Sequence, residues 1–404
     1  MMKHIVFVIG NYKNGGVPMR STNLANEFAK NGYDVDILVT GEIADDVFFT
    51  RAEGVKLVSL KKFSSFCKND AEVNKIKRKQ AKKISLLKKW RYVTKGFPAQ
   101  DIKAENAIRE IRKGEAMLPY AAKHQDSIYI TFGVEYFDMT FCATKLFGSK
   151  VIYAERNAPE VDFPKDEKKK QQLLHLLKNA SGAVLQTHDE LEFFENTFKN
   201  AVVIRNPVKP DLPEPHKGGR RKVIVNFCRI AEQKNLPLMI NAFIKLHEEY
   251  PEYSLEIYGN TVTENENSIR KKLIDVIEKL GAADYIKILP PRQDVHRMIR
   301  DCTVFVSSSD FEGLSNSMIE AMAIGLPCVC TDCLGGGARE MISYEENGLL
   351  VPMKDVDALY FAMKRMIEDD ELRERCSKNA AKIRELLSAE NIAKQWIEYI
   401  ESVT

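Results

Sequence analysis

The sequence predicts an α/β protein with two doubly wound parallel sheets. The chain has 404 residues, and because a single hydrophobic core rarely grows beyond about 250–300 residues, we expect two domains. In each half, short β-branched runs alternate with amphipathic helical patterns, as βαβ crossovers do. Between the halves, prolines and glycines in "NPVKPDLPEPHKGGRRK" (206–222) indicate an exposed connection.

Each half contains its own series of expected strands. The strands of the first half are "HIVFVIG", "YDVDILVT", "GVKLVSL", "SIYITFG", "KVIYAE", "GAVLQT" and "VVIRNP". Those of the second half are "KVIVNFC", "YSLEIYG", "YIKILP", "CTVFVSS", "PCVCT" and "GLLVP". We therefore place one Rossmann-like domain at 1–206 and a second at 207–385. The final pattern, "AENIAKQWIEYIESVT", has Ile392, Trp396, Ile397 and Ile400 on one face, so residues 386–404 are expected to form a helix that docks on another element.

Composition excludes several classes of protein. Hydrophobic residues make up 44% of the chain, and no stretch approaches the roughly 20 apolar residues of a membrane span. The apolar run at 4–9 is interpreted as a strand rather than a signal peptide, so we expect a cytoplasmic protein. Eight cysteines suggest no disulfide framework. Cys328, Cys330 and Cys333 are interpreted as buried thiols rather than metal ligands.

A strongly basic segment runs from residue 61 to residue 95. It carries 13 basic residues against Asp70 and Glu72. Apolar residues recur beside the lysines at helical spacing, namely Val73, Ile76, Ile84, Leu87 and Trp90. Two interpretations stay open: a solvated helix face, or a basic amphipathic surface that meets anionic lipid headgroups or an anionic acceptor. Nucleic acid is disfavoured, because no zinc-finger or aromatic-rich signature accompanies the charge.

Loops that follow strands of the second half collect cations, glycines and carboxylates. Arg229 and Lys234 lie in "FCRIAEQKNLPLMINAF" after the first of these strands, and Glu312 and Glu320 follow "CTVFVSSSD". The next strand is followed by three consecutive glycines at 335–337. Ligands of open α/β sheets bind at the carboxyl ends of the strands, so these groups should face the cleft between the domains.

This combination suits a sugar nucleotide. Arg229 and Lys234 can neutralise a diphosphate, while backbone amides at a helix start near Ser315 can bind its oxygens. Glu320 can accept hydrogen bonds from ribose hydroxyls, and Glu312, outside the helix, can face the transferred group. The remaining donor-binding residues are expected to be Gly313, Leu314, Ser315, Asn316 and Ser317.

The first half contributes a glycine pair at its first strand–helix junction. In "GNYKNGGVPMRSTNLA", Gly15 and Gly16 precede a helix whose predicted N-cap is Ser21 or Thr22. These glycines could let the backbone approach the donor closely, although an ordinary loop remains the alternative. The G-x-G-x-x-G fingerprint is absent, which disfavours a nicotinamide dehydrogenase. The D-x-D of Asp34 and Asp36 is interpreted as strand-edge polarity.

Several motifs together resemble one enzyme family. "FEGLSNSMIEAMAIGLP" resembles the E-x7-E motif of the retaining glycosyltransferases of family 4. "NGG", "NPV", "RIAEQKNL" and "TDCLGGGARE" with "NGLLVP" occur in the order typical of that family. The resemblance is close along about 200–380 and weaker along 1–60 and 125–160. The resemblance implies the GT-B architecture, with residues 386–404 crossing back onto the first domain. It also implies an enzyme that needs no cofactor or metal, because protein cations and the start of a helix hold the diphosphate.

The chain departs from the family at one position. Many members have a histidine after the strand that corresponds to "KVIYA", whereas this chain has "AERNAPE". We expect Glu155, Arg156 and Asn157 to bind the sugar or the acceptor, without a choice among the three.

These features favour a retaining hexosyltransferase. It would transfer a hexose or N-acetylhexosamine from a UDP-sugar to a cell-surface glycan or lipid-linked acceptor, at the inner face of the membrane. One alternative is a sugar-nucleotide epimerase of the same architecture. Another is a non-catalytic subunit that binds a membrane or a partner through 61–95.

Overall fold

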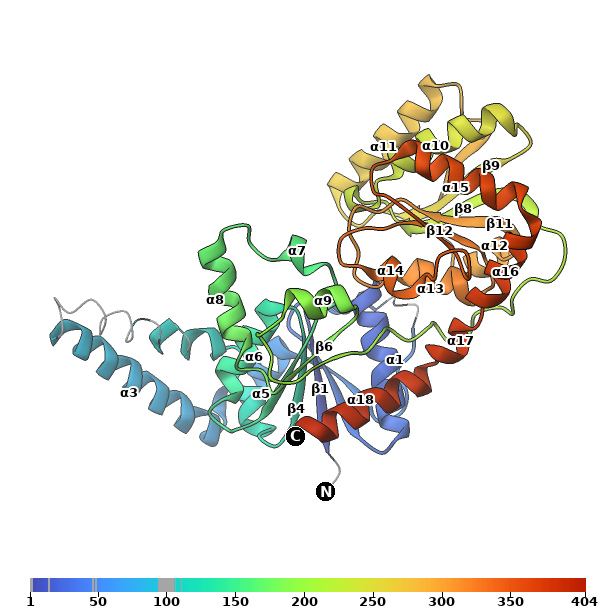
Figure 1. Ribbon diagram of the computed structural model, residues 1–404. Helices are drawn as coiled ribbons and strands as arrows, with labels where there is room; N and C mark the ends of the chain where they lie inside the picture. The colour runs from blue at the N-terminus through green and yellow to red at the C-terminus, as the bar shows by residue number, and fades with distance from the viewer. Residues whose placement is uncertain are drawn as a thin grey trace.

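The computed structural model describes residues 3–13, 15–45, 47, 49–93, 105, 107–109 and 111–404. It contains two parallel sheets, flanked by helices and lying side by side (Figure 1). The first sheet has seven strands in the order β3-β2-β1-β4-β5-β6-β7, and the second has six in the order β10-β9-β8-β11-β12-β13. All strand pairs are parallel, which confirms the predicted fold class.

The inner strands of both sheets are largely buried, as expected for parallel sheets that helices cover. In the first sheet the strands are β1 (His4–Ile9), β2 (Asp34–Val39), β3 (Val55–Ser59), β4 (Ile128–Phe132), β5 (Lys150–Ala154), β6 (Gly182–Leu185) and β7 (Ala201–Val203). In the second sheet they are β8 (Arg221–Arg229), β9 (Ser254–Asn260), β10 (Ile286–Leu289), β11 (Cys302–Ser307), β12 (Cys328–Thr331) and β13 (Leu349–Val351).

Helices lie between most successive strands, but none lies between β2 and β3 among the described residues. Those of the first domain are α1 (Gly16–Lys30), α2 (Leu60–Phe66), α3 (Ala71–Val93), α5 (Leu118–Lys123), α6 (Val134–Thr144), α7 (Pro159–Asp162), α8 (Glu167–Leu177) and α9 (His188–Phe193). Those of the second domain are α10 (Leu236–Glu249), α11 (Glu264–Lys279), α12 (Val295–Ile299), α13 (Asn316–Ala323), α14 (Gly337–Met341), α15 (Val356–Glu368) and α16 (Asp370–Ala380).

Two further helices lead the chain back to the first domain. They are α17 (Ile383–Leu386) and α18 (Ala389–Val403), and α18 lies along α1 (Figure 1). Trp396, on the apolar face of α18, is buried, and the Tyr399 hydroxyl donates to the Asn200 carbonyl oxygen at 2.9 Å. The amphipathic pattern of the last helix is therefore satisfied by apolar contacts with the first domain.

Two local predictions were wrong. Helix α1 begins at Gly16 with Gly15 as its N-cap, so Ser21 and Thr22 lie inside the helix and are buried. The earlier start is possible because Pro18 falls in the first turn, where no backbone N–H is needed. In the D-x-D motif, Asp34 pairs with Lys56 at the sheet edge as expected, but Asp36 is buried and accepts a hydrogen bond from the Tyr120 hydroxyl.

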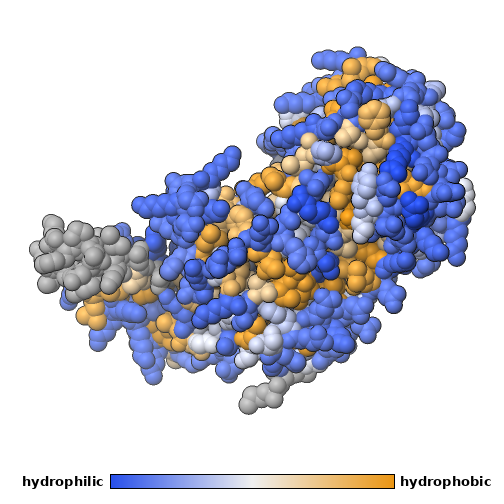
Figure 2. Space-filling view, in the orientation of Figure 1, coloured by the Kyte–Doolittle hydropathy of each residue, from blue (hydrophilic) through white to orange (hydrophobic). Residues whose placement is uncertain are grey.

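The basic segment forms α2 and α3. Helix α3 projects away from the first sheet (Figure 1), and Val73 at its start packs with Cys67 and Ala122. Figure 2 shows hydrophilic and hydrophobic residues side by side along this projecting helix. Residues 94 and 95 and the side chain of Trp90 lie outside the described residues. None of the helices in the described part of the chain has the length and hydrophobicity needed to span a bilayer.

Candidate active site

The residues that were expected to bind the donor lie at the edge of the second sheet that faces the first domain. Arg229 ends β8, and Lys234 ends the short 3-10 helix η2 (Glu232–Lys234) that follows. This turn is fixed to the loop after β11, because the Ser308 hydroxyl donates to the Lys234 carbonyl oxygen at 2.8 Å and the Asp310 amide donates to the Gln233 carbonyl oxygen at 2.8 Å. The chain thus brings its two predicted cations next to the E-x7-E segment.

Lys234 and Glu312 form a direct ion pair. Both side chains are largely buried, and the Ser309 hydroxyl donates to the same carboxylate oxygen of Glu312 at 3.0 Å. Burial alone would lower the pKa of the Lys234 amine, but the adjacent carboxylate outweighs it and raises this pKa. Lys234 is therefore a fixed positive charge at neutral pH, with ammonium hydrogens left to donate to an anion.

Arg229 lies on the more open side of this turn. Its side chain is half exposed, with Nε 3.4 Å from Glu266 Oε1, and it donates to Gln233 Oε1 at 3.3 Å. The guanidinium is thus oriented by two side chains while part of its surface remains accessible to a ligand.

Helix α13 presents its amino terminus at the same place. Ser315 is its N-cap, and its hydroxyl lies 3.2 Å from that of Ser317. The first backbone amides of a helix have no partner within the helix, so they can donate to an anion. The predicted helix start near Ser315 is therefore present, beside the Lys234–Glu312 pair.

Glu320, one turn into α13, has partners from both domains. Arg20 of α1 donates to Glu320 Oε1 at 2.6 Å, and His296 Nε2 of α12 lies 2.9 Å from Glu320 Oε2. Burial would raise the pKa of Glu320, but its hydrogen bond with His296 and the charge of Arg20 lower it overall, so the carboxylate is ionised at neutral pH. Sequence reasoning missed Arg20 and His296, because Arg20 belongs to the other domain and His296 to a separate helix, and neither position has a local pattern that pairs it with Glu320.

The two glycines of the first domain, Gly15 and Gly16, differ in their surroundings. A Cβ on Gly16 would lie 3.0 Å from Asn316 Nδ2, so Gly16 allows α1 to approach α13 closely. Gly15 has no comparable neighbour among the described residues. Arg20, one turn into α1, donates to Asn316 Oδ1 at 3.0 Å and strengthens the same contact.

The segment 155–157 lies across the domain boundary from Gly313. A Cβ on Gly313 would lie 3.1 Å from the Arg156 carbonyl oxygen. Leu314 donates its amide to Gln186 Oε1 at 3.2 Å, which adds a second contact between the domains here. The structure therefore places the backbone of the predicted sugar- or acceptor-binding residues next to Gly313, one of the predicted donor-binding residues.

The three side chains at 155–157 already have partners. Glu155 is buried and accepts hydrogen bonds from the backbone amides of Arg156 at 2.8 Å and Asn157 at 3.2 Å. The Asn157 side chain donates to Asp162 at 2.8 Å. The Arg156 guanidinium lies 4.7 Å from the Phe132 ring centre, and burial lowers its pKa to about 10. Of the three, Arg156 retains most donors for a ligand, because within the described part of the chain its guanidinium makes one hydrogen bond, to the Glu155 carbonyl oxygen.

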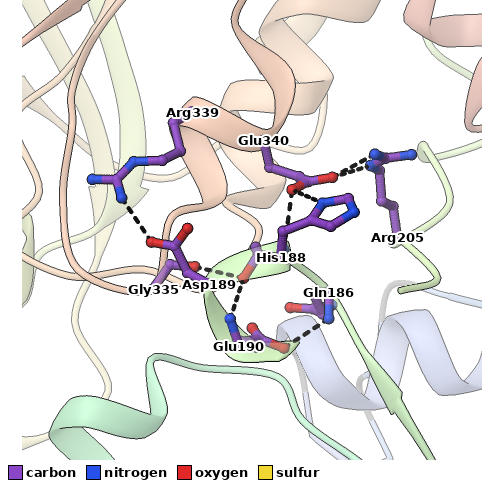
Figure 3. Close-up of polar contacts among 9 residues, drawn as sticks. Gln186, His188, Asp189, Glu190, Arg205, Gly335, Arg339 and Glu340 are labelled. Carbon is purple, nitrogen blue, oxygen red and sulfur yellow. Dashed lines mark hydrogen bonds and ion pairs between the residues drawn. The ribbon is translucent and has the colours of Figure 1, made fainter. Parts of the chain in front are cut away.

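A polar network joins the domains beside this site (Figure 3). Glu340 of α14 accepts from Arg205 Nε at 3.0 Å and lies 2.9 Å from His188 Nδ1. Arg339 donates to Asp189 at 2.8 Å, and the Thr187 hydroxyl donates to the Gly335 carbonyl oxygen at 2.9 Å. The glycine loop 335–337 is therefore in contact with the first domain rather than open to a ligand.

The cysteine cluster does not form part of the site. Cys328, Cys330 and Cys333 are free and buried, as interpreted from the sequence. Burial raises the pKa of each thiol above its usual value, so none is a thiolate at neutral pH.

Two Rossmann-like domains that face each other, each with a parallel sheet, have the architecture of the GT-B fold. Residues 209–383 match the family of glycosyl transferases group 1. Similar proteins agree with the class. The chain is 24% identical, over 98% of its length and 99% of the relative's, to an uncharacterized glycosyltransferase of Haemophilus influenzae.

Two further relatives extend the comparison. A Campylobacter jejuni protein, N-acetylgalactosamine-N,N'-diacetylbacillosaminyl-diphospho-undecaprenol 4-alpha-N-acetylgalactosaminyltransferase, is 32% identical over 44% of this chain and 46% of its own. The crystal structure of TarM matches with a TM-score of 0.73 over 99% of both chains at 15% identity, which shows the shared fold. A mutant of S. aureus TarM, with a TM-score of 0.72 at 16% identity over 98% of this chain and 99% of its own, was solved with UDP bound.

These findings make the protein a glycosyltransferase enzyme and give no support to the epimerase alternative.

Proposed function

We propose that the protein transfers a hexose or N-acetylhexosamine from a UDP-sugar to a cell-surface glycan or lipid-linked acceptor, with retention at the anomeric carbon. The observation that carries the proposal is the arrangement of Lys234, Glu312 and the amino terminus of α13 at one edge of the second sheet. The names of the relatives support it, since one is an N-acetylgalactosaminyltransferase of a diphospho-undecaprenol acceptor and another was solved with UDP.

The protein's contribution to the reaction is electrostatic. Arg229, Lys234 and the amides of α13 stabilise the charge that develops on the departing diphosphate. The acceptor hydroxyl attacks the anomeric carbon from the face that the diphosphate leaves, and a donor phosphate oxygen takes its proton. No metal is required for this step, because the cations and amides take the place of one. Glu312 orients the sugar through its hydroxyls.

Glu320 is proposed to hold the ribose. A carboxylate has about four lone-pair sites, and Arg20 and His296 use one oxygen each. A ribose hydroxyl can therefore add to the existing contacts without displacing them. In this arrangement Arg20 and His296 keep the carboxylate ionised and correctly oriented.

The basic helix α3 is proposed to bring the enzyme to an anionic membrane that carries the acceptor. Its exposed cations are Lys75, Arg78, Lys79, Lys82, Lys83, Lys88 and Lys89. Leu86 on the same helix is 57% exposed, and Phe66 before it is 89% exposed. Each cation near an anionic surface contributes about 1 kcal/mol. Co-sedimentation with phosphatidylglycerol vesicles should therefore exceed that with phosphatidylcholine vesicles, and equal sedimentation would reject this part of the proposal.

A thermal-shift panel tests the donor assignment. UDP, GDP, ADP, CMP and their common sugars are added without metal and again with Mg²⁺, to wild type and to Glu320→Ala. A ligand at about 100 times its Kd stabilises the folded state by about 2.7 kcal/mol. UDP should raise the Tm of the wild type equally with and without Mg²⁺, and the shift should be lost in Glu320→Ala but kept in the surface variant Glu374→Ala. A panel in which no nucleotide raises the Tm would refute the donor site.

The product then tests retention. Proton NMR of the transferred sugar should show the same anomeric configuration as the donor, and the opposite configuration would refute a retaining mechanism.

A further inference from the structure

A second cluster of ligand-type side chains lies at the far end of the first sheet. His4 starts β1, Asp36 lies in β2, and His124 is the C-cap residue of α5. One nitrogen or oxygen atom from each of the three lies within 4.8 Å of the others. His4 lies at the amino end of β1, whereas the proposed donor site faces the carboxyl end of that strand. The strand rises by roughly 3.3 Å per residue, so its length separates this cluster from the transfer chemistry.

Two atoms of this cluster are buried without a hydrogen-bond partner among the described residues. They are Asp36 Oδ1 and His4 Nε2. Asp36 is only 3% exposed, and His4 Nε2 lies 3.5 Å from the other carboxylate oxygen of Asp36. Buried polar atoms are nearly always satisfied by protein, water or an ion, so this pair of atoms requires an explanation.

Outer contacts orient both side chains toward a common point. His4 Nδ1 lies 2.6 Å from the Ser127 hydroxyl, and the Tyr120 hydroxyl donates to Asp36 Oδ2. When Nδ1 carries the proton and donates to Ser127, the lone pair of His4 Nε2 faces the carboxylate of Asp36. A metal cation between the two groups would relieve their repulsion. Histidines that bind metals use their second nitrogen in this way.

His124 completes the set. Its ring stacks on Tyr120 at 4.3 Å between centres and lies 4.9 Å from the His4 ring. The neutral imidazole is the form of histidine that binds metals. Two imidazoles and one carboxylate are a donor set that suits zinc and similar divalent ions.

We propose that His4, Asp36 and His124 bind a divalent transition-metal ion of the zinc type, which ties β1, β2 and α5 together at the amino-terminal edge of the first sheet. The role is structural, and the site is independent of the donor. The competing explanation is an ion pair between protonated His4 and Asp36 that binds no metal.

Zinc titration of the full chain separates these explanations. The protein is stripped with a chelator, desalted, and titrated with Zn²⁺ against a chromophoric competitor, while Tm is measured in parallel. We expect one high-affinity equivalent and a raised Tm in the wild type. His124→Ala and Asp36→Asn should weaken this binding more than about 100-fold, whereas Ser127→Ala, which removes an outer contact, should weaken it about 10–100-fold.

His175→Ala is the matched control, because His175 is exposed on α8. It should bind zinc as the wild type does. Unchanged zinc binding in both His124→Ala and Asp36→Asn would mean adventitious surface binding and overturn the proposal, as would a wild type that binds none. His124 lies outside the strands, so His124→Ala decides the question if Asp36→Asn fails to fold.

Discussion

At the residue scale, the site depends on buried charges that hold one another in place. Glu320 keeps its charge because Arg20 and His296 lie within 2.6 Å and 2.9 Å of its oxygens. The E-x7-E spacing identified Glu320 and Glu312 from the sequence. Their partners could not be predicted from local patterns, because Arg20 belongs to the other domain and His296 to a separate helix.

The charge of Glu320 predicts a pH-dependent stability. Its pKa is lowered in the folded state, so its stabilising contribution is complete above the unfolded pKa of about 4.5 and is lost as the pH falls through the lower, folded pKa. Glu320→Gln leaves Arg20 buried without its partner and should lower the free energy of unfolding at pH 7 by about 3–5 kcal/mol.

Urea unfolding between pH 7 and pH 3 measures this effect. The difference between wild type and Glu320→Gln should shrink as the pH falls below about 4.5. A difference that stays constant down to pH 3 would show that the Glu320 charge does not stabilise the fold.

At the scale of single elements, α18 could be predicted as an amphipathic helix but its contacts could not. The helical spacing of Ile392, Trp396 and Ile400 predicted an apolar face. The surface that this face covers could not be predicted, because it depends on the return of α17 and α18 to the first domain. By contrast, α1 starts earlier than predicted, with Gly15 as its N-cap. Pro18 is tolerated there because it lies in the first turn, where a backbone N–H has no partner within the helix.

Trp396 tests the docking of α18. Its side chain is 1% exposed and lies 5.9 Å from the Arg156 guanidinium. Trp396→Ala should lower the free energy of unfolding by about 3–5 kcal/mol, as expected for a large buried ring. Phe361→Ala is the control, since Phe361 is 61% exposed and should change stability by less than about 0.5 kcal/mol. Equal effects of the two substitutions, measured by urea unfolding, would rule out tight docking of α18.

At the scale of the whole molecule, the two sheets could be predicted from the alternation of strand and helix patterns, but the contacts between the two domains could not. One group of polar contacts between the domains, shown in Figure 3, comes from residues without a distinctive sequence pattern, namely Glu340, Arg205, His188 and Asp189. Glu340 is largely buried, and His188 and Arg205 lower its pKa despite that burial.

Breaking this network should open the molecule. Glu340→Ala removes the partner of both Arg205 and His188, so small-angle scattering should show a larger radius of gyration than for the wild type or for Glu374→Ala, an exposed glutamate on α16. Acidification of the wild type below about pH 4.5 should act in the same direction, because protonation of Glu340 weakens the contact. An unchanged radius of gyration in Glu340→Ala would show that other contacts hold the domains.

The most direct test of the proposed chemistry is the rate of sugar transfer in variants of the two cations. With the donor selected by the nucleotide panel, Arg229→Ala and Lys234→Ala should each lower kcat by about 10²–10³, because each removes a group that stabilises the leaving diphosphate. Lys245→Ala, which removes an ion-paired surface lysine on α10, should leave kcat unchanged. Near-normal kcat in both cation variants would contradict the account.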